Sequence, residues 1–170
     1  VAPAEALLKA GEYTTCYNGY GPTENTVCTT LYKVSRSDTG KRALPIGRPV
    51  GNVQVYVLNS ASSIQPLGID GELCIAGAGL SAGYLGRPGL TADKFIANPF
   101  GSGLLYRTGD KGRWLPDGNL QFSGRIDNQV KIRGFRIEKD EIAQALSLFP
   151  GINGVAVVVR ATAGDKYLVA

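Results

Sequence analysis

Three short segments of the chain combine glycine with side chains that can bind nucleotides or metal ions. The first is Tyr20-Gly21-Pro22-Thr23-Glu24, in which an aromatic ring, a hydroxyl and a carboxylate lie close together along a backbone that glycine makes permissive. Such a set suits stacking on a base, contact with a phosphate and binding of Mg²⁺. Taken alone, the segment is equally consistent with a simple turn between two strands.

The other two segments have the same ambiguity. In Thr108-Gly109-Asp110, a carboxylate that follows glycine could accept hydrogen bonds from both hydroxyls of a ribose, or the three residues could form a plain turn. In Gly124-Arg125-Ile126-Asp127, the arginine could contact a ribose or phosphate oxygen, or form a surface ion pair. Neither a P-loop nor a Gly-x-Gly-x-x-Gly motif after a strand occurs in the sequence.

The composition excludes several kinds of chemistry within these 170 residues. The sequence has no histidine, which rules out a Ser-His-Asp triad, a histidine-ligated zinc site and a histidine general base in this stretch. Its three cysteines, Cys16, Cys28 and Cys74, form no Cys-x-x-Cys pair. They are expected to be buried free thiols in a reducing compartment, which favours a cytoplasmic protein.

Charge and hydropathy give no sign of a nucleic-acid or membrane partner. The net charge is +4 and the charges are scattered; only residues 131–136 are clustered, and there a solvated strand face is the simpler interpretation. No run approaches the roughly 18 apolar residues of a membrane-spanning helix, and no leader is visible. Because the sequence starts at Val1, lacks methionine and stops within an apparent strand, we expect a stretch of a longer polypeptide.

The elements that position these segments are expected to be short and mostly strands, because 23 glycines and nine prolines imply many tight turns. The predicted helices are 3–10 and 90–96, and the predicted strands are 13–17, 27–34, 53–57, 71–76, 104–107, 113–115 and 120–123. The segment 18–24 is expected to be a turn. Antiparallel strands with glycine corners between 53 and 125 indicate a barrel or a sandwich.

The pattern changes near residue 127. Val130 and Ile132 alternate with charged residues, a helical pattern follows over 138–149 with acidic residues in its first turn, and 155–159 is an apolar strand. This β-β-α-β run differs from the preceding strands. We therefore predict one domain over 1–126 and the beginning of another over 127–170.

The order and spacing of the motifs carry more information than each motif alone. Together they resemble adenylation domains of nonribosomal peptide synthetases, in the adenylate-forming (AMP-binding) enzyme superfamily, and the likeness spans nearly the whole chain in that family's order. The motifs are Asn18-Gly19-Tyr20-Gly21-Pro22-Thr23-Glu24, Gly71-Glu72-Leu73-Cys74-Ile75-Ala76-Gly77, Gly83-Tyr84-Leu85-Gly86-Arg87-Pro88, Tyr106-Arg107-Thr108-Gly109-Asp110 and the long run from Gly124 to Glu138.

The resemblance implies both a fold and an activity. It implies a mixed α and β fold: the end of the AMP-binding core with a distorted antiparallel β-barrel, followed by the start of a small α+β lid. It implies ATP- and Mg²⁺-dependent activation of an amino acid as an aminoacyl adenylate, then transfer to the phosphopantetheine thiol of a peptidyl carrier protein. The phosphate loop and the catalytic lysine of the family would lie outside this stretch, so these 170 residues alone are expected to be inactive.

The resemblance also assigns roles to single residues at the nucleotide. Tyr20 would stack on adenine, with Phe122 against its other side. Asp110 would hold the ribose hydroxyls, with Arg125 beside it. Thr23 would contact the phosphates, and Glu24 would bind the Mg²⁺ ion.

Further roles concern the amino acid, the lid and partners. Asp127 would be the hinge of the lid, and Gly134 with its neighbours would face the thiol channel. The segment 95–100 resembles a surface that some adenylation domains present to an MbtH-like protein, although a helix end packing on its own core explains it as well. The positions matching the amino-acid side-chain pocket are Gly19, Val27 and Cys28.

Two other functions remain open at the level of sequence. One is a stand-alone acyl or aryl acid ligase of the same superfamily, which shares the Thr-Gly-Asp and Gly-Arg elements. The other is a non-catalytic binding module, such as a degenerate adenylation domain. The sequence names neither the amino acid nor the product.

Overall fold

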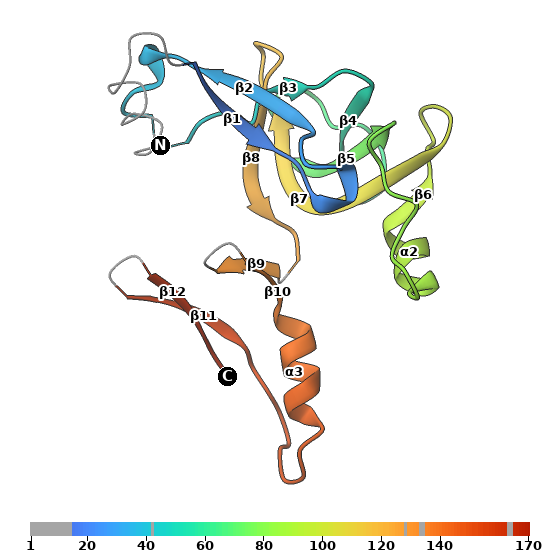
Figure 1. Cartoon of the computed structure of the whole chain (residues 1–170), viewed down its shortest axis with the longest axis vertical. Helices are drawn as coiled ribbons and strands as arrows, with labels where there is room; N and C mark the ends of the chain where they lie inside the picture. The colour runs from blue at the N-terminus through green and yellow to red at the C-terminus, as the bar shows by residue number, and fades with distance from the viewer. Residues whose placement is uncertain (1–14, 42, 128, 133–134, 163–164) are drawn as a thin grey trace. The chain divides into compact units, whose positions relative to one another are not determined.

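The computed structural model describes residues 15–41, 43–127, 129–132, 135–162 and 165–170 (Figure 1). The chain forms two compact units, Val1–Gly124 and Arg125–Ala170. The helix predicted over 3–10 lies outside the described residues. Within the described residues, no helix is both long and apolar enough to span a membrane.

A five-stranded antiparallel sheet is the centre of the first unit. Strands β4 (Val53–Leu58), β5 (Gly71–Gly77), β7 (Leu104–Trp114) and β6 (Phe95–Ala97) follow one another in that order, and β8 (Leu120–Arg125) also pairs with β7. The central strand β5 is apolar on both faces because both faces are covered. One side packs Val57, Ile75 and Tyr106 among other side chains, and the other packs Cys74 with its neighbours.

Cys74 lies in a part of the sheet from which solvent is excluded. It has no exposed surface, and burial raises the pKa of its thiol to about 12. Cys16 and Cys28 are only partly buried, and all three cysteines are free thiols. The expectation of buried thiols is therefore confirmed for Cys74 alone.

A smaller three-stranded sheet carries the first motif. Its strands are β1 (Cys16–Tyr20), β2 (Thr30–Val34) and β3 (Arg48–Pro49), in that order and antiparallel. The segments η1 (Thr23–Asn25) and η2 (Arg36–Asp38) are single 3₁₀ turns after β1 and β2. Residues 13 and 14 of the predicted strand lie outside the described residues, and β1 extends to Tyr20, so it includes three of the seven residues predicted as a turn.

Strand β7 corrects a second prediction. Residues 104–107 and 113–115 were expected to be two short strands separated by a turn, but β7 runs without interruption for 11 residues. The strand is irregular in its middle: Glu72 pairs with Lys111 and Cys74 with Arg107, so that Leu73 alone faces residues 108–110. The Thr-Gly-Asp motif is therefore a β-bulge inside a strand, not a turn between strands.

The helix after the glycine-rich loop begins earlier than predicted. Helix α2 spans Pro88–Lys94, with proline in its first turn, where the missing N–H costs no helical hydrogen bond. Phe95 and Ile96, assigned to the helix from the sequence, belong to β6. The side chain of Phe95 is buried in the core of the sheet.

The second unit contains two hairpins and one helix. The hairpins are β9 (Gln129–Ile132) with β10 (Phe135–Glu138), and β11 (Val158–Thr162) with β12 (Asp165–Val169); α3 (Lys139–Ser147) lies between them in the sequence. The strand predicted over 155–159 begins only at Val158. Gly134 lies outside the described residues, so its proposed place at the thiol channel stays a prediction.

The mixed α and β class is confirmed. The distorted barrel is not seen as a closed structure: among the described residues the five-stranded sheet is open, because β4 and β6 stand at its ends.

Candidate active site

Tyr20 and Asp110 meet although they come from different motifs and different sheets. Tyr20 ends β1, Asp110 lies in β7, and the tyrosine hydroxyl donates a hydrogen bond of 2.6 Å to Oδ2 of the carboxylate. The Asp110 side chain is nearly buried, with 8% of its surface exposed. An aromatic face and a carboxylate thus share one site, as recognition of a base and a ribose requires.

Phe122 is the second aromatic group at this site. Its ring centroid lies 6.4 Å from that of Tyr20, with a tilt of 36° between the rings. A planar base inserted between parallel rings needs about 7 Å, twice the contact distance of carbon atoms. At 6.4 Å the two tilted rings are in direct contact, so a base could enter between them only if they opened and became parallel. Phe122 is 40% exposed on β8, so its ring has room to move.

Two side chains hold the bulge that carries Asp110. The Thr108 hydroxyl donates to the carbonyl of Leu73 at 2.6 Å and accepts the N–H of Asp110 at 2.9 Å. The N–H of Gly109 donates to Oε1 of Glu72 at 3.1 Å. Gly109 has φ +71°, a conformation that favours glycine. The bulge therefore uses the Thr108 hydroxyl and the positive φ of Gly109, which explains the first two residues of the Thr-Gly-Asp motif.

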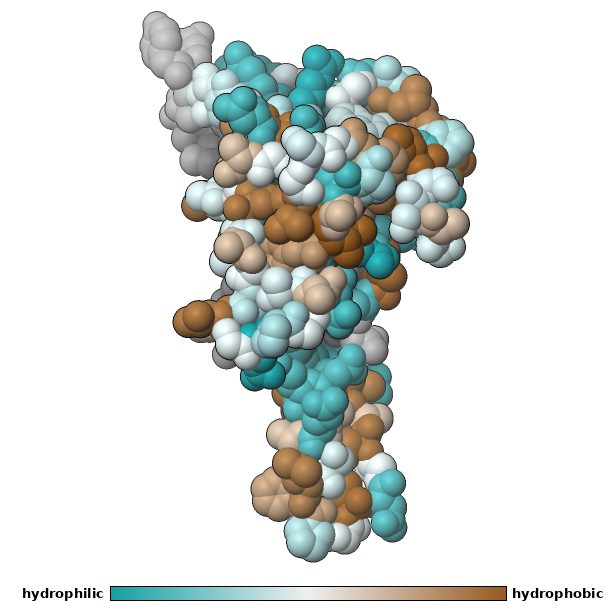
Figure 2. Space-filling model, turned by 90° about the vertical axis from the view of Figure 1, so that its right-hand side faces the viewer, coloured by the Kyte–Doolittle hydropathy of each residue, from teal (hydrophilic) through white to brown (hydrophobic). Residues whose placement is uncertain are grey.

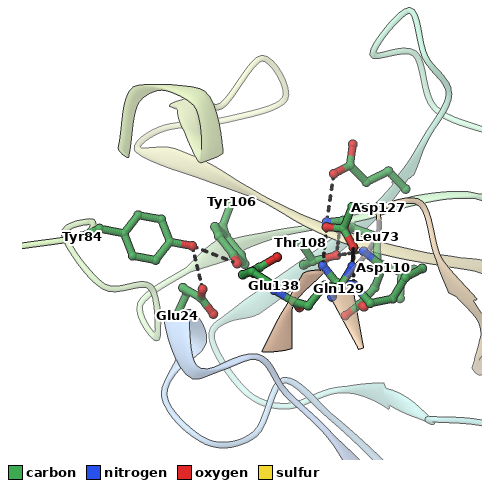
Figure 3. A network of polar contacts seen from close by, with 12 residues as sticks. Glu24, Leu73, Tyr84, Tyr106, Thr108, Asp110, Asp127, Gln129 and Glu138 are labelled. Carbon is green, nitrogen blue, oxygen red and sulfur yellow. Dashed lines mark hydrogen bonds and ion pairs between the residues drawn. The ribbon is translucent and has the colours of Figure 1, made fainter. Parts of the chain in front are cut away.

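Glu24 lies in η1 and contacts two tyrosines that had no assigned role. Its carboxylate is buried, and Oε1 accepts a 2.6 Å hydrogen bond from the hydroxyl of Tyr84 (Figure 3). The Tyr84 hydroxyl is also 3.3 Å from that of Tyr106, whose pKa is raised, first by burial and then by the hydrogen bond to Tyr84. These hydroxyls thus fix the carboxylate in a defined orientation.

The position of Glu24 fits a Mg²⁺ ion held together with a nucleotide. Among the described residues, no group of three or more histidine, cysteine or acidic side chains could form a complete metal site. Mg²⁺ in nucleotide enzymes commonly uses one or two carboxylates, with phosphate oxygens and water completing the octahedron. A single oriented carboxylate such as Glu24 suits that arrangement. Thr23 precedes it in η1 with its side chain exposed.

The three predicted pocket residues divide into two groups. A Cβ added at Gly19 would lie 3.8 Å from the Cys28 sulfur, so these two positions adjoin each other. Val27 is 87% exposed and does not join them in the described structure. Thr26 and Val27 both have positive φ, at 38° and 67°, which is costly for residues with a Cβ. Such strain is commonly found at functional segments.

Gly21 explains why this strained segment can fold back on the first motif. A Cβ at Gly21 would lie 2.5 Å from the carbonyl oxygen of Val27, which is impossible without movement. The close approach lets the N–H of Thr29 reach the carbonyl of Tyr20 at 2.8 Å. The glycine of the motif is therefore required by packing.

Arg125 and Asp127, in the second unit, form a two-point ion pair. Nε of Arg125 lies 2.6 Å from Oδ1 of Asp127, and Nη2 lies 2.5 Å from Oδ2. Oδ1 also accepts the N–H of Gln129 at 3.2 Å. Of the two interpretations left open by the sequence, the structure contains the ion pair. The contact of Arg125 with a nucleotide stays a prediction.

The comparisons with known proteins agree with this geometry. The family model described as AMP-binding enzyme matches residues 1–85, half of the chain. The chain belongs to the AMP-binding enzyme family. The membership of the adenylate-forming superfamily predicted from the motifs is thereby confirmed.

Relatives of this AMP-binding chain include large synthetases. It is 49% identical over 167 residues to surfactin synthase subunit 3 of Bacillus subtilis (strain 168), covering 97% of the chain and 13% of that protein. It is 52% identical over 152 residues to tyrocidine synthase 3 of Brevibacillus parabrevis, covering 87% of the chain and 2% of that protein. The chain thus spans only a small part of these relatives.

Among solved structures, the chain resembles PA1221, an NRPS protein containing adenylation and PCP domains. The TM-score is 0.83 at 35% identity, covering 98% of this chain and 34% of that one. The likeness to adenylation domains of nonribosomal peptide synthetases, predicted from the order of the motifs, is confirmed. The AMP-binding chain therefore has the fold of the later part of such a domain.

Proposed function

We propose that this chain is part of a domain that activates an amino acid with ATP and loads it onto a carrier protein in nonribosomal peptide synthesis. The hydrogen bond between Tyr20 and Asp110, with Phe122 beside them, carries the proposal. It brings the groups for a base and a ribose together from motifs far apart in the sequence. The similarity to adenylation domains supports the same activity.

At the nucleotide, Tyr20 and Phe122 stack on the two faces of adenine. Asp110 accepts hydrogen bonds from the ribose hydroxyls while Oδ2 keeps the Tyr20 hydroxyl. Arg125 contacts the ribose, which requires its guanidinium to exchange part of its pairing with Asp127. The side chains of Arg125 and Asp127 are 20% and 35% exposed, so the pair is partly open to solvent.

At the phosphates, Thr23 and Glu24 act together. The exposed Thr23 hydroxyl donates to a phosphate oxygen, and the Glu24 carboxylate, which Tyr84 orients, would hold Mg²⁺. When bound, Mg²⁺ offsets the negative charge that grows as pyrophosphate leaves. The chain's own contribution is to place that ion beside the phosphates before the reaction.

We assign Gly19, Val27 and Cys28 to the pocket for the amino-acid side chain. Gly19 and Cys28 support this by adjoining each other. Val27 would join them when the strained segment closes over substrate. The amino acid itself is not identified by these three positions.

Asp127 is the proposed hinge between a core domain over 1–126 and a lid that starts at 127. Rotation there lets one site host adenylate formation and then thiol transfer, two steps that need different surroundings. The partners are a peptidyl carrier domain with its phosphopantetheine thiol and, for some members, an MbtH-like protein. The three free thiols support a reducing, cytoplasmic location.

The segment 95–100, which follows α2, is the proposed place for an MbtH-like partner. Figure 2 looks onto the side where α2 and β6 lie in Figure 1 and shows apolar surface among polar surface. A shallow hollow of about 500 Å³ is lined by residues that precede this segment, among them Tyr84, Leu85, Pro88 and Thr91. Ala97, at the end of β6, is exposed.

The test is amino-acid-dependent exchange of pyrophosphate into ATP by the full-length enzyme, with a panel of amino acids and of carboxylic acids without an amino group. Exchange with one amino acid, followed by labelling of the carrier, supports the proposal. Exchange only with acids that lack the amino group would establish the acid ligase. Failure to bind ATP at all would establish the non-catalytic module.

A further inference from the structure

Glu72 belongs to a motif of the sequence and holds the bulge beside Asp110, but no role in nucleotide binding has been assigned to it so far. It lies in β5, and its side chain is nearly buried, with 11% of its surface exposed. The two carboxylate oxygens serve different partners. Oε2 accepts from Nε and Nη2 of Arg107 at 3.0 and 2.7 Å, and Oε1 accepts from the N–H of Gly109 at 3.1 Å.

These contacts replace hydrogen bonds that the bulge removes from the sheet. Where three residues of β7 face Leu73 alone, regular ladder hydrogen bonds are lost. The Thr108 hydroxyl satisfies the carbonyl of Leu73, and the Glu72 carboxylate satisfies the N–H of Gly109. Glu72 therefore fixes the residue that immediately precedes Asp110.

Arg107 fixes Glu72 in turn. It contacts a single oxygen of the carboxylate with two nitrogens, which leaves the other oxygen directed at the bulge. The pKa of Arg107 is raised, first by this side-chain hydrogen bond. Arg107 and Glu72 come from two motifs, 35 positions apart.

We infer that Glu72, oriented by Arg107, is a positioning residue that aims the Asp110 carboxylate at the ribose by holding the bulge at Gly109. The inference rests on the proposed function, because it assumes that Asp110 binds the ribose. The competing explanation is that Glu72 and Arg107 form an ion pair that only joins β5 to β7. That explanation predicts a loss of stability without any change in nucleotide preference.

The experiment measures binding of ATP and of 2′,3′-dideoxy ATP to the full-length enzyme by calorimetry. Glu72→Ala should weaken ATP binding about tenfold and leave dideoxy ATP within about twofold, because only ATP uses the aimed carboxylate. Glu72→Gln should be intermediate, since its amide oxygen can still accept the Gly109 N–H. The double variant Glu72→Ala/Asp110→Ala should bind ATP no more weakly than Asp110→Ala alone.

Asp70→Asn is the matched control. Asp70 also pairs with cations of β7, at 3.8 Å from Lys111 and from Arg113, two residues that lie outside the bulge. It should leave the preference for ATP over dideoxy ATP unchanged.

The outcomes separate the inference from the proposed function. If Asp110→Ala loses the preference for ATP but both Glu72 variants keep it, the positioning role is wrong and the ribose role stands. If Asp110→Ala itself keeps the preference, the ribose role is wrong and the inference falls with it. If Glu72→Gln weakens the binding of both nucleotides equally and lowers the melting temperature, Glu72 and Arg107 form an ion pair that only joins β5 to β7.

Discussion

The hydroxyl of Tyr20 and the Oδ2 atom of Asp110 lie 2.6 Å apart, although the residues are 90 positions apart in the sequence. The bond joins the ring proposed to stack on adenine to the carboxylate proposed to hold the ribose. In the proposed site, recognition of the base would therefore be coupled to recognition of the sugar through this hydrogen bond.

Substitutions at Tyr20 should separate stacking from this coupling. Tyr20→Phe keeps the ring and removes one hydrogen bond, so ATP binding should weaken by about 0.5–1.5 kcal/mol. Tyr20→Ala also removes the stacking surface, which contributes about 1–3 kcal/mol per base. Calorimetric titration of the full-length enzyme with ATP measures both. Equal losses for the two variants would show that the ring does not stack, and Tyr32→Phe, which removes a hydroxyl that bonds Asp38, serves as a control.

Asp38 should make the stability of the folded chain depend on pH under acidic conditions. Burial opposes its ionisation, but hydrogen bonds from Lys41, Ser35 and Tyr32 outweigh it and lower the pKa of Asp38 from 3.8 to about 2. Because the pKa is lower in the folded state, the stabilisation is complete above about pH 4 and is lost as pH falls toward 2.

The check compares thermal unfolding of the unmodified chain with that of Asp38→Asn across this range. The difference in melting temperature should be largest near pH 5 and shrink as the pH approaches 2. A difference that stays constant over the range would contradict the lowered pKa. Asp38→Ala, which removes every acceptor of this side chain, should cost about 1–3 kcal/mol at neutral pH.

Two glycines with similar φ should respond very differently to alanine. Gly47 has φ +88°, and a Cβ there would lie 1.9 Å from the carbonyl oxygen of Leu31; Gly40 has φ +83° and open space around the same position. Gly40→Ala should cost about 1–2 kcal/mol for the left-handed conformation alone. Gly47→Ala should cost about 3 kcal/mol or more, because the backbone of β2 must also move. Denaturant unfolding measures both, and equal costs would show that β2 yields without penalty.

Ala97 should mark the proposed partner surface. Its side chain is exposed at the end of β6 while Phe95 is buried, so only part of this segment packs on its own core. Co-expression with an MbtH-like protein should raise the soluble yield of the full-length enzyme, and Ala97→Glu should abolish that increase. Ala61→Glu, at an exposed turn, should retain it. An increase that persists in Ala97→Glu would place the partner elsewhere.

Two substitutions of Asp127 should separate its proposed role as a hinge from its ion pair with Arg125. Asp127→Ala removes the pairing with Arg125 and leaves the backbone unrestricted, whereas Asp127→Pro also fixes φ at about −65°. The alanine variant should change both half-reactions modestly. The proline variant should keep adenylate formation nearly normal and reduce transfer to the carrier thiol by orders of magnitude. Pyrophosphate exchange and carrier loading report the two steps separately, and proportional losses in both would place the pivot elsewhere.

The sequence predicted the family and the mixed fold because several glycine-rich motifs occur in one order over nearly the whole chain. It misjudged β7 because Thr108-Gly109-Asp110 has the local composition of a turn. The strand continues through these residues only because Glu72 and Thr108 replace the lost ladder hydrogen bonds, and Glu72 is 37 positions from Gly109. Local pattern cannot reveal a contact over that separation.

The same limit explains why Tyr84 and Tyr106 were missed. Each was visible as part of a motif, but the hydrogen bond from Tyr84 to Glu24 spans 60 positions. The sequence did contain one signal: both positions hold tyrosine and not phenylalanine, so each ring carries a hydroxyl that can form a hydrogen bond. The hydroxyl groups become interpretable only when the structure shows the buried carboxylate that they approach.

The rate at which the Cys74 thiol is alkylated should report how often the central sheet opens. Alkylating reagents attack the thiolate, and this thiol has neither exposed surface nor an accessible ionised form at neutral pH. Its modification must therefore wait until β5 separates from a neighbouring strand, so the labelling rate counts opening events of the central sheet. Cys16 and Cys28 are partly exposed and would react without that delay, which gives an internal reference within the same molecule.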